Sequence, residues 1–459
     1  MSNPNIVGDR IQALKDQARA TSGQVLKTPA FFQLRKELHN QLLNEVSPED
    51  IGGQVNQYEI KQQISQIVNS VAVRQGIPLS PEQKALLINE LTDEVLGFGP
   101  LEPLLRDDSI TEVMVNGHQN VFVERNGKLI KLNELLFEDE NHLLHVIKRI
   151  AIRIGRRVDF ASPMVDARLP DGSRVNAVVA PVSLDGSALT VRKFPKKALL
   201  LEDMVSLGAL TPKMAKFVSL CVLGKMNTLV AGGTGSGKTT LLNALSAFIP
   251  NHERVITIED SAELRLQQDH VVRLETRPPN AEGQGEIVSR DLVKNSLRMR
   301  PNRIIVGECR SGEALDMLQA MNTGHEGSMT TLHANTTRDT LKRLETLVLM
   351  SGLELPLKTV REMIASTIHI VILQSRFSDG SRRVKQISEI VGMEGDMITS
   401  QDIFVFKQTG IDSNGKVVGQ FLPTGVLPKS LSHLKNSGIE VPMDLFAPDA
   451  GAQPTPRRS

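Results

Sequence analysis

Apolar residues in the first part of the chain recur at every third or fourth position. The segments FFQLRKELHNQLL and YEIKQQISQIVNSVAVRQG have this spacing between polar turns, which is typical of amphipathic helices. A third helix is expected in PEQKALLINELTDEVLGF, which starts after Ser80 with Pro81 in its first turn. We therefore predict a helical module over residues 1–78 and place the third helix at the start of the domain that follows.

From Ile110 the apolar period changes to two. The segments ITEVMV and NVFVE are followed by RNGK and LIKL, a pattern that indicates a hairpin closed by Asn126-Gly127. A helix, NHLLHVIKRIAIRIG, and the strand-like pieces RVNAVVAPV and ALTVRKF come next. Together they predict a small α+β domain of PAS-like type over residues 79–197.

After this domain the pattern becomes strand, glycine-rich loop and helix. The apolar runs LVAGG, RVITIED, HVVRLE, RIIVGE and GSMTTL alternate with amphipathic segments such as SGEALDMLQAM and DTLKRLETLVLM. This alternation predicts a largely parallel sheet covered by helices on its faces. We assign residues 198–430 to this α/β nucleotide-binding domain, in which RVKQISEIVGME and the strand pattern after it are expected to be antiparallel. Residues 431–459 are predicted to be a tail with a disordered end, GAQPTPRRS.

Composition narrows the classes of partner. The 53 Lys and Arg residues against 52 Asp and Glu give a net charge of +1, so no overall field attracts nucleic acid or anionic lipid. Trp is absent and Tyr58 is the only tyrosine, which removes the usual platforms for stacking single-stranded bases. Arg300 and Arg303 beside Pro301 are basic enough for nucleic acid, but a short charged turn is the favoured interpretation.

The two cysteines, Cys221 and Cys309, are far apart in the sequence and form no Cys-x-x-Cys pair that would hold zinc or run redox chemistry. The first residues have neither the basic start nor the apolar core of a signal peptide, and no run reaches the ~18 apolar residues of a membrane span. We therefore expect a cytoplasmic protein.

The stretch AGGTGSGKTT, residues 231–240, fits the phosphate-loop pattern G-x-x-x-x-G-K-[ST] between a strand and a helix. Without Cβ atoms, its glycines let backbone N–H groups turn toward phosphate oxygens, and the helix start adds its positive end. Lys238 is expected to reach the β and γ phosphates, and Thr239 to ligate Mg²⁺. The pattern predicts binding of ATP through Gly233, Thr234, Gly235, Ser236, Gly237, Lys238, Thr239 and Thr240.

Acidic residues follow two later strands. RVITIEDSAEL carries Glu259, Asp260 and Glu263, and RPNRIIVGECR carries Glu308 after its apolar run. Carboxylates at the carboxyl edge of such a sheet, where α/β ligands bind, can order the waters of Mg²⁺ and orient the attacking water. Each acidic segment alone is also compatible with an ordinary surface loop, and GSMTTLHANT, with His333 at its end, is no more specific by itself.

The order of these segments is more specific. A phosphate loop, an IEDSAE box, a GECR strand and a TTLHA strand resemble the type II/type IV secretion ATPase superfamily. Residues 97–200, with GFGPLEPLLRDDSITEVMVNG and FASPMVDARLPDGSRVNAV, are also similar to the amino-terminal domain of the tight-adherence (Flp) pilus motors of the CpaF type. The chain lacks the two Cys-x-x-Cys pairs usual in type II secretion and type IVa extension motors. Their absence favours the tight-adherence or conjugation-related branch, although retraction motors lack them too.

The resemblance implies a RecA-like P-loop domain that works in a hexameric ring, with ATP hydrolysed between the two domains and a neighbouring subunit. It implies that Lys238 and Thr239 hold the phosphate and the Mg²⁺, and that Glu263 is the base that orients the water. Glu259 and Asp260 are the other two acids of the IEDSAE segment in this family pattern. It also implies that Glu308 supports the metal and that His333 lies near the γ-phosphate.

Arginine is expected to neutralise the charge that develops on the transferring phosphoryl group. Arg168 and Arg174 in DARLPDGSRV are the favoured candidates, because they match the nucleotide contacts of the family's amino-terminal domain. Arg192, Arg298 and Arg310 are further candidates, and a solvated surface charge is the alternative for each of the five.

The leading hypothesis is a motor ATPase, peripheral at the inner membrane of a bacterium, that powers assembly, or assembly and retraction, of a tight-adherence type IV pilus. Its partners would be its own copies and inner-membrane platform proteins, contacted through residues 1–78, with no direct nucleic acid. The alternatives are a conjugation, secretion or DNA-translocating RecA-like ATPase, and a scaffold that binds ATP without cleaving it. A small-molecule kinase would explain the loop but not the acid box.

Overall fold

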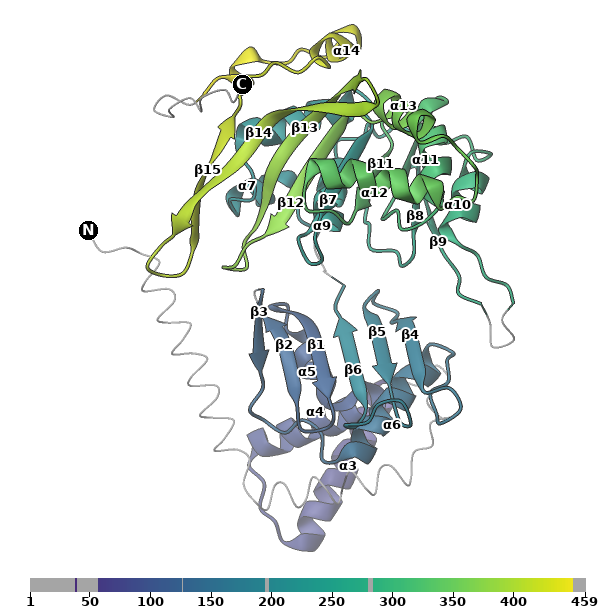
Figure 1. Ribbon diagram of the computed structural model, residues 1–459. Coiled ribbons are helices and arrows are strands. Elements are labelled where there is room, and N and C mark those ends of the chain that lie inside the picture. The colour runs from purple at the N-terminus through teal and green to yellow at the C-terminus, as the bar shows by residue number, and fades with distance from the viewer. Residues whose placement is uncertain (1–37, 39–56, 126, 195–197, 280–283, 449–459) are drawn as a thin grey trace, which may run out of the picture. The chain divides into compact units, whose positions relative to one another are not determined.

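The computed structural model describes residues 38, 57–125, 127–194, 198–279 and 284–448 (Figure 1). The chain divides into two compact units, Met1–Phe194 and Pro195–Ser459. Of the first predicted helix, FFQLRKELHNQLL, only Leu38 lies within the described residues, and the end GAQPTPRRS lies outside them. None of the described helices combines the length and the apolar character that crossing a bilayer requires.

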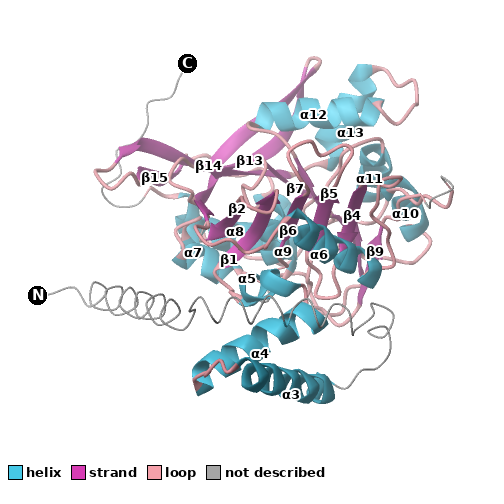
Figure 2. Cartoon of the chain, turned by 90° about the horizontal axis from the view of Figure 1, so that it is seen from below, coloured by secondary structure: helices cyan, strands magenta, loops and turns pink. Residues whose placement is uncertain are grey.

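After Leu38, the described part of the first unit starts with two helices that pack against each other, α3 (Gln57–Gln75) and α4 (Pro81–Leu96) (Figure 2). As predicted, α4 starts after Ser80, whose hydroxyl accepts a hydrogen bond from the Gln83 backbone N–H while the Gln83 side chain bonds back to Ser80. This reciprocal capping satisfies two donors that a helix start leaves open. The two helices share one hydrophobic cluster across the predicted boundary between residues 78 and 79; its buried members include Ile64, Val68, Val71, Leu87 and Leu91.

The first unit contains a six-stranded sheet with the order β3-β2-β1-β6-β5-β4. Every neighbouring pair in it is antiparallel. The predicted β2–β3 hairpin is confirmed by the pairing of Arg125 with Lys128; Asn126 itself lies outside the described residues. The elements are η2 (Gly99–Leu101), α5 (Glu102–Arg106), β1 (Ile110–Asn116), β2 (Val121–Arg125), β3 (Lys128–Lys131), α6 (Glu140–Arg153), β4 (Met164–Arg168), β5 (Arg174–Val178) and β6 (Ala188–Arg192).

The second unit contains a nine-stranded sheet with the order β15-β14-β13-β12-β7-β11-β10-β8-β9 (Figure 1). The six strands from β12 to β9 are parallel, and β13 to β15 extend the sheet in antiparallel fashion. Both features were predicted from the sequence and are confirmed. The strands are β7 (Thr228–Gly232), β8 (Val255–Glu259), β9 (Val271–Glu275), β10 (Arg303–Val306), β11 (Met329–Leu332), β12 (Ile370–Arg376), β13 (Arg382–Glu394), β14 (Met397–Ile411) and β15 (Val417–Pro423).

Helices cover both faces of the parallel strands. Successive residues of a strand point to opposite faces, and accordingly Val230 and Leu229 of β7 belong to two different hydrophobic clusters. The cluster around Val230 includes α7 (Leu201–Ser206), α8 (Pro212–Leu223) and α9 (Lys238–Ser246). The cluster around Leu229 includes residues of α10 (Ser289–Ser296), α11 (Glu313–Asn322), α12 (Thr337–Leu349) and α13 (Leu357–Thr367).

Residues 431–446, assigned from the sequence to a tail, carry helix α14 (Leu431–Asn436) and the short turn η3 (Met443–Phe446). Leu434, Leu445 and Phe446 are buried in the cluster that contains α8. The Phe446 ring lies 5.5 Å from that of Phe217, between ring centroids. The stretch is therefore part of the core of the second unit.

Candidate active site

The glycine-rich loop connects β7 to α9 at the carboxyl end of the parallel strands. Gly235 and Gly237 have φ values of +68° and +94°, a conformation that residues with a Cβ atom rarely adopt. The first helical bond runs from the Leu241 N–H to the Gly237 carbonyl at 2.9 Å. All eight residues predicted to bind the nucleotide lie in this loop and in the first turn of α9, where unpaired N–H groups can bind an anion.

The sheet order brings the other candidates to the same edge. Strand β11 lies beside β7, β10 beside β11, and β8 beside β10, all parallel. Since parallel strands end at one edge, the residues at or just after their carboxyl ends come near the loop. These residues are Glu259 on β8, Glu308 after β10 and His333 after β11.

Lys238 is 8% exposed, and its ammonium donates a hydrogen bond to the Gly233 carbonyl at 3.2 Å. The same nitrogen lies 3.4 Å from Nε2 of His333. Nε2 of His333 in turn lies 2.8 Å from a carboxylate oxygen of Glu308. Burial first, and the Lys238 charge second, lower the pKa of His333 below its ordinary value. The structure thus joins three predicted residues, one from the start of α9 and two from the segments after β10 and β11. It favours a neutral imidazole between a cation and a carboxylate.

Arg310 bridges the two acidic segments. Its Nε and Nη2 donate to Oε2 of Glu308 at 2.9 and 2.6 Å, and its Nη1 lies 3.4 Å from Oδ2 of Asp260. Arg310 was one of the three less favoured arginines, and the structure places it next to the predicted acids. Its side chain remains 58% exposed, so solvent weakens each of these ion pairs.

Glu259 is the most enclosed of the acids, at 4% exposure. One carboxylate oxygen accepts the backbone N–H groups of Glu263 and Leu264 at 2.8 and 2.9 Å. The other oxygen is buried and has no hydrogen-bond partner among the described residues. Burial raises the pKa of Glu259 to about 7. Glu259 therefore fixes the turn that carries Glu263, which is half-buried, while Asp260 is exposed.

Gly307 makes this arrangement possible. A Cβ atom at Gly307 would lie only 2.9 Å from Cγ of Glu259. Strand β10 can therefore end beside the buried carboxyl of β8 only with glycine at this position, which is the physical reason for glycine in the GECR segment.

The residues predicted to hold Mg²⁺ suit that ion. Thr239 supplies a hydroxyl at the start of α9, Glu308 supplies a carboxylate, and Oε2 of Glu259 is a buried acceptor without a partner among the described residues. Such oxygen donors are the ligands that Mg²⁺ prefers. Within the described residues no group of three or more His, Cys, Asp or Glu side chains could hold a metal alone.

Three of the remaining arginine candidates lie in the first unit, and the fourth lies in the second. Arg168 and Arg174 face each other across β4 and β5 in the first unit, and the Arg168 guanidinium lies over the Phe194 ring at 5.7 Å from its centroid. Arg192, on β6 of the same sheet, pairs with Arg174 on β5. A role of these three at the nucleotide stays a prediction. Arg298 is exposed in the connection that leads to the amino end of β10.

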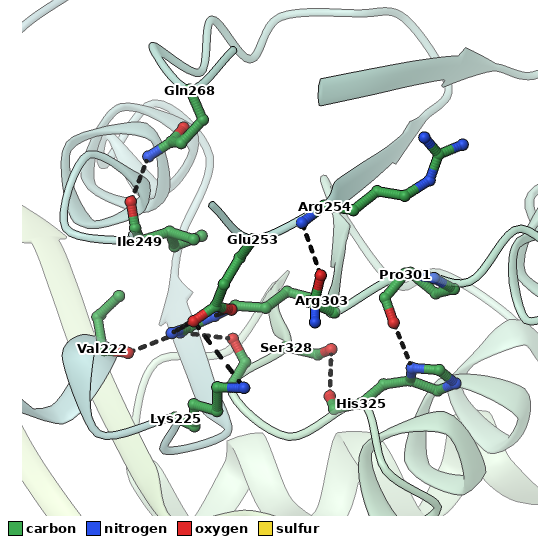
Figure 3. A network of polar contacts seen from close by, with 12 residues as sticks. Val222, Lys225, Ile249, Glu253, Arg254, Gln268, Pro301, Arg303, His325 and Ser328 are labelled. Carbon is green, nitrogen blue, oxygen red and sulfur yellow. Dashed lines mark hydrogen bonds and ion pairs between the residues drawn. The ribbon is translucent and has the colours of Figure 1, made fainter. Parts of the chain in front are cut away.

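The basic segment before β10 is not a nucleic-acid surface at Arg303. This residue is 0% exposed, and its Nε and Nη2 donate to the two carboxylate oxygens of Glu253 at 2.6 and 3.1 Å (Figure 3). Its Nη1 donates to the Val222 carbonyl at 2.6 Å. The predicted charged turn is right for Arg300, which is exposed, and wrong for Arg303, whose charge is neutralised inside the protein.

Sequence reasoning missed three residues beside the loop. Gln374 and Arg376 end strand β12, Arg382 begins β13, and all three approach the loop glycines. The only signal is the Gln-x-Arg at the end of an apolar run, because nothing in the sequence shows that β12 pairs with β7.

Comparison with known proteins identifies the family. The model of the type II/IV secretion system protein family matches residues 94–415. The chain is 32% identical over 291 residues to the conjugal transfer protein TrbB of Rhizobium radiobacter, with 63% of this chain and 86% of that protein covered. It is 30% identical over 347 residues to the type IV secretion system protein VirB11 of Bartonella quintana, with 67% and 94% covered.

Among solved structures, the chain is similar to the VirB11 ATPase of the Brucella suis type IV secretion system in complex with sulphate. The identity is 31%, the TM-score is 0.35, and 63% of this chain and 94% of that one are covered. The family match spans more than half of the sequence and includes the phosphate loop, both acidic segments and His333. The chain therefore belongs to the type II/IV secretion system ATPase family.

Proposed function

We propose that this protein is the motor ATPase of a tight-adherence (Flp) pilus, and that it hydrolyses ATP at loop 233–240 to drive pilus assembly. The observation that carries the ATPase part is the contact of Lys238 with His333 and of His333 with Glu308 at the end of the loop. The pilus part rests on the similarity of residues 97–200 to motors of the CpaF type and on the absence of paired Cys-x-x-Cys motifs from the sequence.

The chemistry follows from the positions of the side chains. Lys238 and the loop N–H groups bind the phosphates, and Glu263, held by Glu259, orients a water toward the γ-phosphorus and takes its proton. The water oxygen forms a bond to the γ-phosphorus while the bond from the γ-phosphorus to the bridging oxygen breaks, and ADP and phosphate leave. Thr239 and Glu308 would hold Mg²⁺, which neutralises phosphate charge when bound. His333, when neutral, contacts the γ-phosphate region and does not repel Lys238.

The motor works as a homo-hexamer that is cytoplasmic and bound to the inner membrane through platform proteins of the pilus. In this proposal Arg168 and Arg174 neutralise charge on the transferring group. The helical module of residues 1–78 contacts the platform. A pull-down with residues 1–78 deleted tests this contact, and unchanged platform binding would exclude it.

The ATPase is tested by comparing K238A and E263Q with the wild type. K238A should lose binding of a fluorescent ATP analogue, whereas E263Q should keep binding and lose phosphate release by about 100-fold or more. The exposed Glu354 serves as a matched control, and E354Q should behave as the wild type. Equal phosphate release from E263Q and the wild type would favour a scaffold that binds ATP without cleaving it.

The second candidate is a conjugation or secretion ATPase, which the similarity to TrbB and VirB11 favours. Direct work on DNA is disfavoured by the net charge of +1 and by the burial of Arg303. Adding DNA to the purified protein should leave its phosphate release unchanged. Genes for a short pilin, a prepilin peptidase and two platform membrane proteins next to this gene would support the pilus role, and conjugation genes there would replace it.

A further inference from the structure

A hairpin from the far side of the sequence lies against the phosphate loop. Strand β12 is parallel to β7 and pairs Gln374 with Gly232, the last residue of β7. Strand β13 returns antiparallel and pairs Arg382 with Arg376. The end of the β12–β13 hairpin therefore stands beside the loop, on the side of β7 opposite β11 and His333.

The contacts between the hairpin and the loop are close. Nε of Arg382 donates a hydrogen bond to the Gly235 carbonyl at 2.9 Å. A Cβ atom at Gly237 would lie 3.0 Å from Nε2 of Gln374 and 3.3 Å from Cδ of Arg382. A Cβ atom at Gly235 would lie 3.4 Å from Nη1 of Arg376. The two positive-φ glycines thus leave the space in which the hairpin side chains approach the loop backbone.

Gln374 is buried between the end of β12 and the phosphate loop. Its side chain is 1% exposed, and its Oε1 atom has no hydrogen-bond partner among the described residues. The hydroxyl of Ser236, also buried, is in the same condition. A Cβ atom at Gly232 would lie within 2.5 Å of both the Gln374 carbonyl oxygen and the Ser236 hydroxyl. The loop therefore packs directly on the end of β12.

The hairpin is held in place from its other side. The carboxylate of Asp379 accepts hydrogen bonds from the Ser381 N–H and hydroxyl at 2.9 and 2.6 Å, and from the Val417 N–H at 2.9 Å. The Arg383 guanidinium lies over the rings of Phe377 and Phe406, at 5.6 and 4.9 Å from their centroids. Arg382 therefore meets the loop from a turn that is held by hydrogen bonds to β15 and by the cation–π contact of Arg383 with Phe406 of β14.

We propose that Arg382 is a positioning residue of the phosphate loop. A peptide group is planar, so a hydrogen bond that holds the Gly235 carbonyl also fixes the direction of the following Ser236 N–H. Two glycines with positive φ have few steric limits of their own. The Ser236 N–H donates to the Gly233 carbonyl at 3.3 Å, and the bond from Arg382 restrains the carbonyl side of the same peptide group. The inference rests on the proposed ATP binding at loop 233–240. It predicts an equal benefit for ADP and ATP, because the loop is common to both.

The test compares R382M, which keeps the apolar stem but removes the donor, with R382K, which restores an N–H donor. Lys385, an exposed cation on the same strand, gives the matched control K385Q. R382M should weaken equilibrium binding of fluorescent ADP and of a non-hydrolysable ATP analogue by the same factor, about tenfold. The value of kcat at saturating ATP should stay within about twofold, as for lost uniform binding. R382K should recover most of the affinity, and K385Q should lose none.

The outcomes separate this inference from the proposed function. If the wild type binds neither nucleotide, the proposed ATPase falls and the inference with it. If the wild type binds both and R382M binds them equally well, only the inference is wrong. A loss confined to the ATP analogue would also overturn it, since that result indicates contact with the γ-phosphate. R382Q is made in parallel, and it decides the question by the same criteria if R382M does not fold.

Discussion

A buried carboxylate lies at each end of strand β8: Glu253 comes just before the strand, and Glu259 is its last residue. The two carboxylates have different surroundings. Beside the amino end, Glu253 receives hydrogen bonds from Arg303 on both of its oxygens. Burial opposes its ionisation, but the bonds and charge of Arg303 outweigh this and lower the pKa of Glu253. At the carboxyl end, Glu259 has one oxygen without a partner among the described residues, and its pKa is raised to about 7.

This difference indicates that, within one sheet, Glu253 stabilises the fold and Glu259 is a candidate for a role in the chemistry. A buried charge with a complete set of partners holds secondary structure together, and it is costly to disrupt. A buried carboxyl with an open oxygen is unfavourable for folding unless something binds there, and perturbed groups of this kind gather at functional sites. Lys238 and His333 lie at the same edge as Glu259, which is the edge where ligands of parallel α/β sheets bind.

The largest effect is expected from breaking the paired end. R303M leaves the Glu253 carboxylate buried without its main partner, and should lower the free energy of unfolding by about 3–5 kcal/mol. Urea unfolding followed by circular dichroism measures this value. The double change R303M/E253Q removes the orphaned charge and should recover part of the loss. A cost of R303M below about 1 kcal/mol would contradict the comparison of the two ends.

At the carboxyl end of β8, E259Q should lower the ATPase activity and raise the stability of the folded protein at high pH. Phosphate release should fall by about 100-fold, because the turn that holds Glu263 loses its charged acceptor. The raised pKa of Glu259 means that its unfolded form, with an ordinary pKa of 4.5, ionises first. The wild type therefore loses stability as the pH rises from 4.5 through about 7, and E259Q escapes this loss.

Unfolding at two pH values tests the stability part. At pH 8, E259Q should be more stable than the wild type by about 1–3 kcal/mol, and below pH 4.5 the difference should vanish. E354Q, at an exposed position, is the control at both pH values. If E259Q were less stable than the wild type at pH 8, the carboxylate of Glu259 would be satisfied in the folded protein.

His333 should give an intermediate effect through pH. Its pKa is lowered from the ordinary value of 6.5 by burial and by Lys238, so the imidazole is neutral at pH 7. Acidification below that pKa creates a second cation beside Lys238, and phosphate release should fall about tenfold per pH unit. H333Q should remove this acid limb, whereas H270Q, at an exposed site, should keep it. An unchanged acid limb in H333Q would assign it to another group.

The smallest effect is expected from Arg310, which matches Arg303 in type but not in environment. Its ion pairs to Glu308 and Asp260 are made by a side chain that is 58% exposed. R310Q should therefore change the free energy of unfolding by less than about 1 kcal/mol. The same urea titration used for R303M measures it, and a loss as large as that of R303M would mean that exposure does not separate the two arginines.

Much of the site could be predicted from the sequence because its signals are local. The phosphate loop has a fixed spacing of Gly232, Gly237, Lys238 and Thr239, and the acids of IEDSAE follow directly on an apolar run. The alternation of apolar runs and amphipathic helices predicts a parallel sheet, and parallel strands necessarily bring their carboxyl ends to one edge. The position of His333 near the γ-phosphate was implied by the family resemblance and not by the strand pattern alone.

Other features depend on residues that are distant in the sequence. Arg382 meets Gly235 only because β12 pairs with β7, and Arg303 is buried because Glu253 and the Val222 carbonyl lie beside it. Leu434 and Phe446, in the segment assigned from the sequence to a tail, enter the core of the second unit because α8 lies beside them. Neither hydrophobic period nor motif spacing contains information of this kind.

The sequence by itself determined the class of the sheet, the phosphate loop and the acids that accompany it, because spacing along one or two elements specifies each of them. Only the tertiary structure decided which buried charges have hydrogen-bond partners among the described residues. It also decided that β12 is the strand that pairs with β7 beside the phosphate loop. The physical reason is that burial and pairing are properties of neighbours in space. Glu253 and Glu259 are six residues apart on one segment, and only their surroundings make one structural and the other a candidate for chemistry.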